Sequence, residues 1–199
     1  MADVSEVWDG PQHLEGLQVD NAITFQDWRH PKFLATCAKH KGGQMDDGRP
    51  WFLGVVNGCF DLFHLGHMNL IAQAVSYQAT GRHVFLVALL NSDASVGRLK
   101  GLHRPYVPLP ARLCMVAMQQ FVEGGAAGFD EDTPEEALSV LRPDFLFKGA
   151  EYEGKSIPGA EHCGKVVFLP ETPGFRTTDL ERRIVAAAGG SVQPPRTGT

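Results

Sequence analysis

Apolar residues along the chain follow two patterns that alternate: continuous runs, and segments in which they recur at helical spacing. Four short runs without polar interruption are typical of strands buried on both faces of a parallel sheet. They span residues 52–56, 83–90, 145–147 and 165–169. The first run ends at Asn57-Gly58, a pair that favours a turn. A weaker candidate strand lies at 122–129, where three glycines reduce strand propensity.

Between these runs, apolar residues recur at helical spacing. A helix is expected from His67 to Gly81, another has Pro110 in its first turn, and two more begin at the capping boxes 133–136 and 178–181. The inward faces are predicted to be Leu70, Ile71, Ala74 and Val75, then Leu113, Val116, Ala117 and Phe121, and in the last helix Leu180, Ile184 and Ala188.

Strands that alternate with helices predict an α/β fold, a doubly wound parallel sheet with right-handed crossovers. In such sheets, ligands bind beyond the carboxyl ends of the strands. The ends of the chain lack periodicity: residues 1–21 are acidic and interrupted by Gly and Pro, and residues 189–199 are polar and Pro-rich. We therefore expect one domain over residues 22–188, between an N-terminal arm and a flexible C-terminal tail.

Composition is that of an ordinary globular protein. The chain has 199 residues, 43% hydrophobic and 21% charged, and a formal net charge of −5. Proteins that follow nucleic-acid phosphates carry a surplus of Lys and Arg, so no nucleic-acid partner is expected. No apolar run approaches the ~20 residues that span a bilayer, and the N-terminus lacks signal-peptide features. The four cysteines lie far apart, without metal or disulfide spacing. Together, these features lead us to expect a cytoplasmic protein with no membrane partner.

The candidate chemistry lies where the first predicted strand leads into the first helix. Residues 57–67 read Asn-Gly-Cys-Phe-Asp-Leu-Phe-His-Leu-Gly-His, so His64 and His67 bracket Gly66 at a helix start. Free N–H groups and the helix dipole attract anions there, and a glycine lets a phosphate approach the backbone. Imidazoles, with a reference pKa of about 6.5, can be protonated beside a polyphosphate and donate hydrogen bonds to it.

This segment resembles the HxGH signature of the nucleotidyltransferase superfamily, whose members join a nucleoside triphosphate to a phosphorylated acceptor and release pyrophosphate. Further segments are similar, in order, to the adenylyltransferase domain of bacterial ADP-heptose synthases, which makes ADP-D-glycero-β-D-manno-heptose. The resemblance covers about residues 22–188 and implies a Rossmann-like nucleotidyltransferase fold. Its segments are 57–67, 90–101, 104–105, 112, 129–136, 141–149, 159–161, 167–170 and 174–180.

The resemblance implies roles for particular residues. Five side chains are expected to stabilise charge at the α-phosphate during catalysis: His64, His67, Lys100, Thr177 and Thr178. Nucleotide binding is expected from Asn57, Gly58, Cys59, Phe60, Asp61, Gly66, Asn91, Asp93, Lys148, Gly149, Phe175 and Arg176. Acceptor binding is expected from Asp61, Arg104, Arg112 and Glu151.

Several of these residues have local features of their own. Arg112 is predicted at a helix start, where the dipole disfavours a cation, so an anionic ligand explains it better than local stability does. Arg176 stands where the heptose enzymes usually carry Ser, and its guanidinium could donate to two phosphate oxygens. Lys100 is expected on a Gly-flanked loop, within reach of a phosphate. Cys59 is interpreted as a small packed residue rather than a nucleophile.

The implied reaction is in-line attack of a heptose 1-phosphate-like sugar phosphate on the α-phosphorus of ATP, which gives an ADP-sugar. Mg²⁺ is expected to arrive with the nucleotide, since no carboxylate cluster predicts a dedicated metal site. A separate sugar kinase would supply the acceptor. In relatives, the region at 122–129 lies near a dimer interface, so a homodimer is one option. Two alternatives remain open: a CTP-dependent cytidylyltransferase acting on a polyol phosphate, an amino-alcohol phosphate or a phosphonate, and a nucleotide-binding module without turnover.

Overall fold

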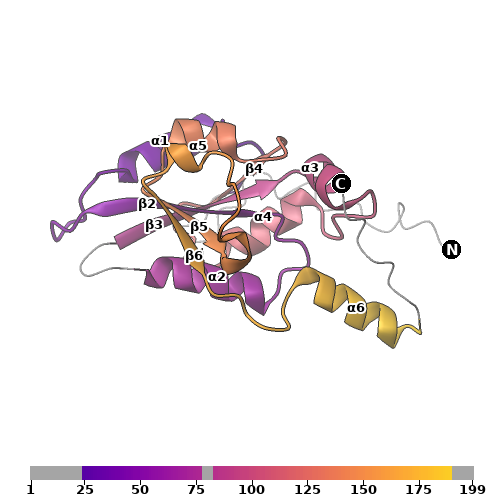
Figure 1. The fold of residues 1–199 in the computed structure, drawn as a ribbon. Helices are drawn as coiled ribbons and strands as arrows, with labels where there is room; N and C mark the ends of the chain where they lie inside the picture. The colour runs from indigo at the N-terminus through magenta and orange to yellow at the C-terminus, as the bar shows by residue number, and fades with distance from the viewer. Residues whose placement is uncertain (1–23, 78–82, 190–199) are drawn as a thin grey trace.

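A parallel sheet of six strands forms the centre of the molecule. The computed structural model describes residues 24–77 and 83–189. The strand order is β1-β4-β3-β2-β5-β6, and every neighbouring pair is parallel. From β2 the chain moves to β3 and β4 on one side, then returns to β5 and β6 on the other (Figure 1). The order therefore reverses between β2 and β5, the position where sheets of this class bind ligands.

The four apolar runs are confirmed as strands. The strands are β1 (Thr24–Phe25), β2 (Trp51–Gly58), β3 (His83–Asn91), β4 (Ala126–Phe129), β5 (Phe145–Gly149) and β6 (Lys165–Leu169). The turn predicted at Asn57-Gly58 is wrong, because both residues remain in β2 and pair with Leu89 and Leu90 of β3. The two parallel strands thus reach the same edge of the sheet.

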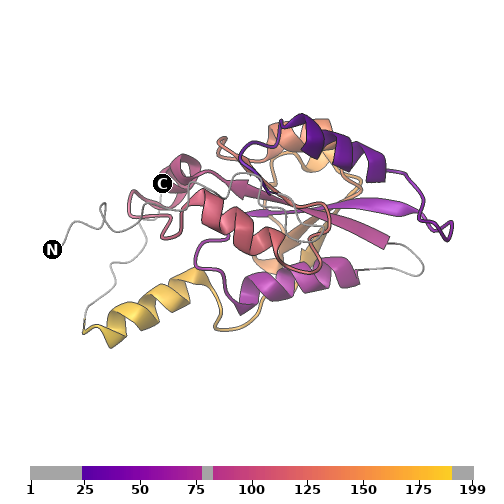
Figure 2. The same cartoon turned by 180° about the vertical axis from the view of Figure 1, so that it is seen from behind.

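Helices cover both faces of the sheet. They are α1 (Pro31–His40), α2 (Leu65–Ser76), α3 (Asp93–Lys100), α4 (Leu109–Ala117), α5 (Glu135–Leu141) and α6 (Thr177–Ala187). Helices α2 and α4 pack on one face, and α1 and α5 on the other (Figures 1 and 2). The doubly wound α/β architecture is confirmed. None of the helices in the described ranges is long and apolar enough to cross a membrane.

Several local expectations are wrong. Phe121 lies beyond the end of α4 and is 42% exposed, because the helix stops at Ala117. Thr133 does not cap α5; Pro134 occupies the N-cap position, and no side chain caps that helix. The pattern also missed β1, α1 and α3. Helix α2 ends at Ser76, with Tyr77 as its C-cap, so the expected continuation to Gly81 is wrong. The expected arm (1–21) and most of the expected tail lie outside the described residues, so the domain boundaries stay predictions.

Helix α6 departs most from the expected packing. It contains no buried residue, Ile184 is 61% exposed, and Ala188 lies just past its end. Both ribbon views show α6 apart from the two helical layers (Figures 1 and 2). Its N-cap is Arg176 rather than Thr178, and the Asp179 carboxylate accepts from the Arg176 N–H at 3.3 Å. Its predicted inward face therefore has no core to cover.

Strand β4 covers only the second half of the candidate strand at 122–129, and its one glycine, Gly128, has a specific steric role. A Cβ at this position would lie 2.4 Å from the carbonyl oxygen of Gln26 and 2.9 Å from Leu109 Cδ2. The absence of a side chain lets the segment after β1 lie against β4, where the Trp28 N–H donates to the Gly128 carbonyl at 2.9 Å. The glycine that weakens strand propensity therefore permits this close packing.

We expect Gly128→Ala to lower the free energy of unfolding by about 1–3 kcal/mol, because the new methyl group forces backbone apart in a packed core. Urea denaturation measures the change. Gly97→Ala is the matched control: Gly97 lies inside α3, where a Cβ would meet the Arg104 carbonyl oxygen at an ordinary 3.6 Å, so alanine should keep or raise stability. Equal stability of the two variants would contradict the close-approach role.

Candidate active site

The segment after β2 lies at the edge of the sheet, at the position where the strand order reverses. It leads into α2, whose N-cap is His64 in an extended conformation; the His64 Nδ1 accepts from the His67 N–H at 3.4 Å. The helix begins at Leu65, two residues before the predicted start. Both histidines thus belong to the N-terminus of a helix, where unpaired N–H groups and the dipole create a positive potential.

The two imidazoles stack on each other. The ring centroids of His64 and His67 lie 3.8 Å apart, with an interplanar angle of 17°. Between them, a Cβ on Gly66 would lie only 2.3 Å from the carbonyl oxygen of Phe175. The glycine therefore also allows the loop before α6 to pass directly over the start of α2.

Burial disfavours the charged form of both histidines in the unliganded protein. It lowers the pKa of His67 to about 3, with a smaller contribution from the neighbouring His64, and it lowers the pKa of His64 as well. Within the described residues, the enclosed His67 Nδ1 has no hydrogen-bond partner. The protonation expected from the reference pKa does not apply without a ligand. A bound polyanion would have to offset the cost of burying the charge.

Helix α6 brings a hydroxyl group to the same place. The Thr177 Oγ1 donates to the Asp61 carbonyl oxygen at 3.0 Å and lies 3.4 Å from the His64 Nε2. Thr178 follows in the first turn of α6. Lys100 is the exposed last residue of α3 rather than a loop residue, and its charge opposes the rise that burial causes in the pKa of Cys59.

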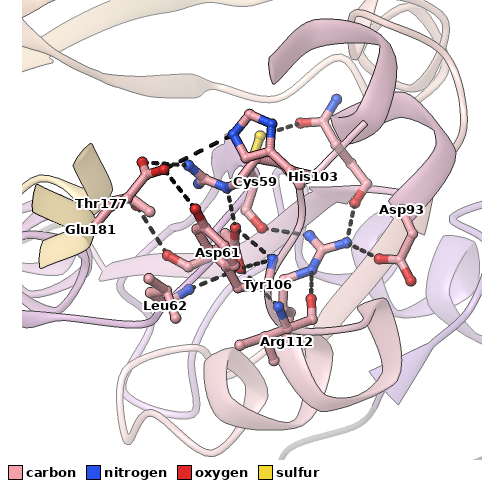
Figure 3. A network of polar contacts seen from close by, with 12 residues as sticks. Cys59, Asp61, Leu62, Asp93, His103, Tyr106, Arg112, Thr177 and Glu181 are labelled. Atoms are coloured by element: carbon pink, nitrogen blue, oxygen red, sulfur yellow. Dashed lines mark hydrogen bonds and ion pairs between the residues drawn. The ribbon is translucent and has the colours of Figure 1, made fainter. Parts of the chain in front are cut away.

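The Asp61 carboxylate is the buried centre of the segment. Its side chain is 0% exposed and accepts from the Arg104 Nε at 2.6 Å, from the backbone N–H groups of Tyr106 and Val107 at 3.0 Å each, and from that of Leu62 at 3.1 Å (Figure 3). Two bulky residues beside it, Phe60 and Leu62, have positive φ angles of 50° and 45°. Strained backbone of this kind persists only where surrounding contacts hold it.

Arg112 has a structural environment that corrects its interpretation as an acceptor ligand. Its side chain is 0% exposed and donates to the carbonyl oxygens of Val107, Cys59 and Asn91, and to the Asp93 carboxylate at 2.7 Å (Figure 3). This network compensates, without a ligand, the unfavourable placement of a positive charge near the start of α4. Asp93 also accepts from the Leu109 N–H at 2.8 Å, so it fixes α4 to the end of β3.

A second polar cluster lies at the end of β5. Lys148 is 9% exposed and donates to the Asn57 Oδ1 at 3.1 Å, and its Nζ lies 4.2 Å from the Tyr152 ring centroid. Burial lowers the pKa of Lys148 to about 8. Burial disfavours the charged form of Glu151 as well, and so raises its pKa; Glu151 also shares a hydrogen bond with Glu171.

The Arg176 guanidinium pairs with Glu171 in this structure, and the arginine side chain is 60% exposed. The expected phosphate donor therefore already has a carboxylate partner when no ligand is bound. A polyphosphate would compete with that partner for the guanidinium.

The structure thus gathers His64, His67, Asp61, Arg104 and Thr177 at one edge of the sheet, with Lys148 and Arg176 in a neighbouring cluster. Within residues 24–77 and 83–189, no three or more His, Cys, Asp or Glu side chains form a group that could hold a metal ion. Sequence reasoning missed Tyr106 as a site residue and Glu171 as the partner of Arg176. It noted Glu181 only as part of a capping box, because contacts across folded loops leave no local pattern.

Comparisons with known proteins show which family the chain is similar to. A family model described as cytidylyltransferase-like matches residues 55–180. The bifunctional protein HldE of Campylobacter jejuni subsp. jejuni serotype O:6 is 42% identical over 128 residues, 64% of this chain and 26% of that protein. HldE of Acidiphilium cryptum is 41% identical over 140 residues, 68% of this chain and 28% of that protein. The chain spans about a quarter of the length of these relatives.

A solved structure, the lipopolysaccharide core biosynthesis protein from Thermoplasma volcanium, shares 18% sequence identity with this chain. Its TM-score is 0.43, and the alignment covers 71% of this chain and 92% of that chain. A likeness of this degree supports no inference about the site.

The lowered pKa values of the histidines predict a loss of stability in acid. Between about pH 6.5 and about pH 3, the unfolded chain binds more protons at His67 than the folded chain, so the free energy of unfolding falls as pH falls. We expect His67→Asn to lose about 2 kcal/mol less than the parent protein between pH 7 and pH 4.5, measured by urea denaturation. Leu102→Asn, which changes a side chain that is 99% exposed and removes no titratable group, should keep the parent's pH dependence. An unchanged pH dependence in His67→Asn would contradict burial as the cause.

Proposed function

The chain belongs to the cytidylyltransferase-like family, and we propose that it transfers AMP from ATP to a sugar phosphate resembling heptose 1-phosphate. The observation that carries this proposal is the meeting of two helix N-termini. His64 caps α2, Thr177 opens α6, and their side-chain atoms lie 3.4 Å apart. Two positive dipole ends with adjacent N–H and O–H donors suit a triphosphate.

In the proposed reaction, an oxygen of the acceptor phosphate attacks the α-phosphorus of ATP in line. The bond from that phosphorus to the oxygen bridging the β-phosphate breaks, and pyrophosphate leaves with that oxygen. A sugar phosphate is already anionic, so no side chain has to remove a proton. His64, His67, Lys100, Thr177 and Thr178 hold the phosphates and stabilise the charge of the transition state.

Neutral imidazoles suit the resting protein because each keeps one N–H to donate. Triphosphate binding brings negative charge beside the enclosed His67 and raises its pKa toward protonation. The unpartnered Nδ1 of His67 is then available to donate. The histidines therefore gain positive charge where the nucleotide needs it, without carrying a buried charge in its absence.

The acceptor is proposed to bind at Arg104, whose Nε is fixed by the buried carboxylate of Asp61 at 2.6 Å. A guanidinium held by one edge presents its other N–H groups in a set direction, which suits a phosphate. Glu151 lies near Lys148 and is proposed to contact the sugar. Arg176 is proposed to leave Glu171 and bind the nucleotide phosphates.

Mg²⁺ is proposed to arrive with the nucleotide. We expect triphosphate oxygens and water to hold the ion. When bound, it would neutralise charge on the phosphates.

The segments at 90–101 and 141–149, which are similar to those of heptose adenylyltransferases, favour ATP over CTP. The similarity to HldE proteins supports the same choice, although the chain matches only about a quarter of each. A separate kinase, a cytoplasmic location and a homodimer remain parts of the proposal. The family model's own description keeps a cytidylyltransferase acting on another phosphorylated acceptor as the second candidate.

A pyrophosphate-release assay tests the proposal, with four nucleoside triphosphates each offered to a panel of sugar 1-phosphates, polyol phosphates and phosphonates. We expect release with ATP and a heptose 1-phosphate, because the segments at 90–101 and 141–149 are similar to those of heptose adenylyltransferases. Release with CTP but not ATP would overturn the adenylyl assignment.

His67→Ala should lower the rate by about 10²–10³-fold, the effect of losing one transition-state donor. His162→Ala, remote in the fold, serves as the matched control.

A further inference from the structure

Helix α6 is weakly anchored for an element that carries a candidate catalytic residue. None of its residues is buried, and it lies apart from the helical layers (Figures 1 and 2). Its first turn is fixed through the Thr177 hydroxyl, which donates to the Asp61 carbonyl oxygen at 3.0 Å. The loop before it is held to α2, where the Asn69 amide donates to the Thr172 Oγ1 at 2.9 Å. The direction of the helix beyond this point needs a second contact.

Glu181 supplies that contact. It lies four residues after Thr177, and residues at this spacing share one face of a helix. Its side chain is 14% exposed and accepts a hydrogen bond from the Tyr106 hydroxyl at 2.6 Å. It also lies 3.7 Å from the Arg104 guanidinium and 3.9 Å from the His103 imidazole (Figure 3). All three partners belong to residues 101–107, here called the α3–α4 loop.

The Tyr106 phenol is a dependable donor for this bond. Burial and the hydrogen bond to Glu181 raise the pKa of Tyr106 to about 12, so the hydroxyl keeps its proton at any physiological pH. The Tyr106 hydroxyl therefore remains able to donate to Glu181 at neutral pH.

The α3–α4 loop is in turn fixed by the segment after β2. The Asp61 carboxylate accepts from the Arg104 Nε and from the N–H groups of Tyr106 and Val107. The contacts thus form a closed ring: Asp61 holds the loop, the loop holds Glu181, and α6 returns to Asp61 through Thr177 (Figure 3). Arg104 lies between two carboxylates in this ring, which offsets the cost of burying its positive charge.

We propose that Glu181 is a positioning residue that holds α6 against the α3–α4 loop and so keeps Thr177 beside His64. This role rests on the proposed function for its catalytic consequence, but the anchoring itself does not. Because Arg104 is the proposed acceptor ligand, the ring joins the acceptor side of the site to the helix proposed to hold the nucleotide phosphates.

Hydrogen exchange of the unliganded, full-length chain tests the anchoring. In Glu181→Ala, backbone amides of α6 and of the α3–α4 loop should exchange about tenfold faster than in the parent protein, since a hydrogen bond to a charged group is lost. Tyr106→Phe removes the same bond from the other side and should give a similar increase. Arg182→Ala is the matched control, because Arg182 pairs only with Asp179 of its own helix among the contacts seen here. Equal exchange of α6 in Glu181→Ala and Arg182→Ala would overturn the proposal.

A double-mutant cycle on pyrophosphate release tests the route through Thr177. Glu181→Ala should lower kcat about tenfold, and adding it to Thr177→Ala should cause a clearly smaller further loss, because Glu181 acts mainly through that hydroxyl. A full additional loss in the double mutant would contradict this route. If no nucleotide and acceptor turn over, the proposed function fails, while the exchange result still decides whether Glu181 anchors α6.

Discussion

The buried carboxylate of Asp61 is the interaction on which the rest of the site depends. A fully enclosed carboxylate is costly unless its oxygens accept several hydrogen bonds and face a cation. Here the Arg104 Nε and three backbone N–H groups meet that need. Satisfying this one side chain therefore fixes the course of the α3–α4 loop. It also holds the strained backbone at Phe60 and Leu62, whose positive φ angles bulky residues rarely adopt.

The position of this carboxylate follows from the topology of the sheet. Because the strand order reverses between β2 and β5, the segment after β2 borders an open edge instead of a covering helix. Two helices begin at that edge, and Gly66 lets the loop before α6 pass over the start of α2. The anion-binding character of the site thus comes mainly from backbone geometry. Side chains such as His64 and Thr177 add donors in set directions.

Much of the fold could be predicted because continuous apolar runs indicate strands that are buried on both faces. The same pattern misjudged α6: a stripe formed by Leu180 and Ile184 indicates a helix but not whether a core lies beside it. Helix boundaries shifted for a similar reason, since the N-caps are His64 and Arg176 rather than the residues with the best capping propensity.

The candidate site was predictable only where its residues are close in sequence. The segment at 57–67 could be found because strand, turn and helix start are contiguous. Arg112 was misinterpreted because the dipole argument considers one helix, whereas its partners at Cys59, Asn91 and Asp93 lie on other segments. The contact of Glu181 with Tyr106 joins residues 75 positions apart, which no local pattern records.

The most direct test of the central role of Asp61 is the free energy of unfolding of Asp61→Asn, measured by urea denaturation. An amide at this position meets backbone N–H donors with an N–H₂ group of its own. It also leaves the buried Arg104 with only the more distant Glu181 carboxylate, at 3.7 Å, as a counter-charge. The account predicts a loss of about 3–5 kcal/mol, typical of a buried ion pair that has lost one partner. A loss below about 1 kcal/mol, as for an exposed ion pair, would show that the site does not depend on this carboxylate.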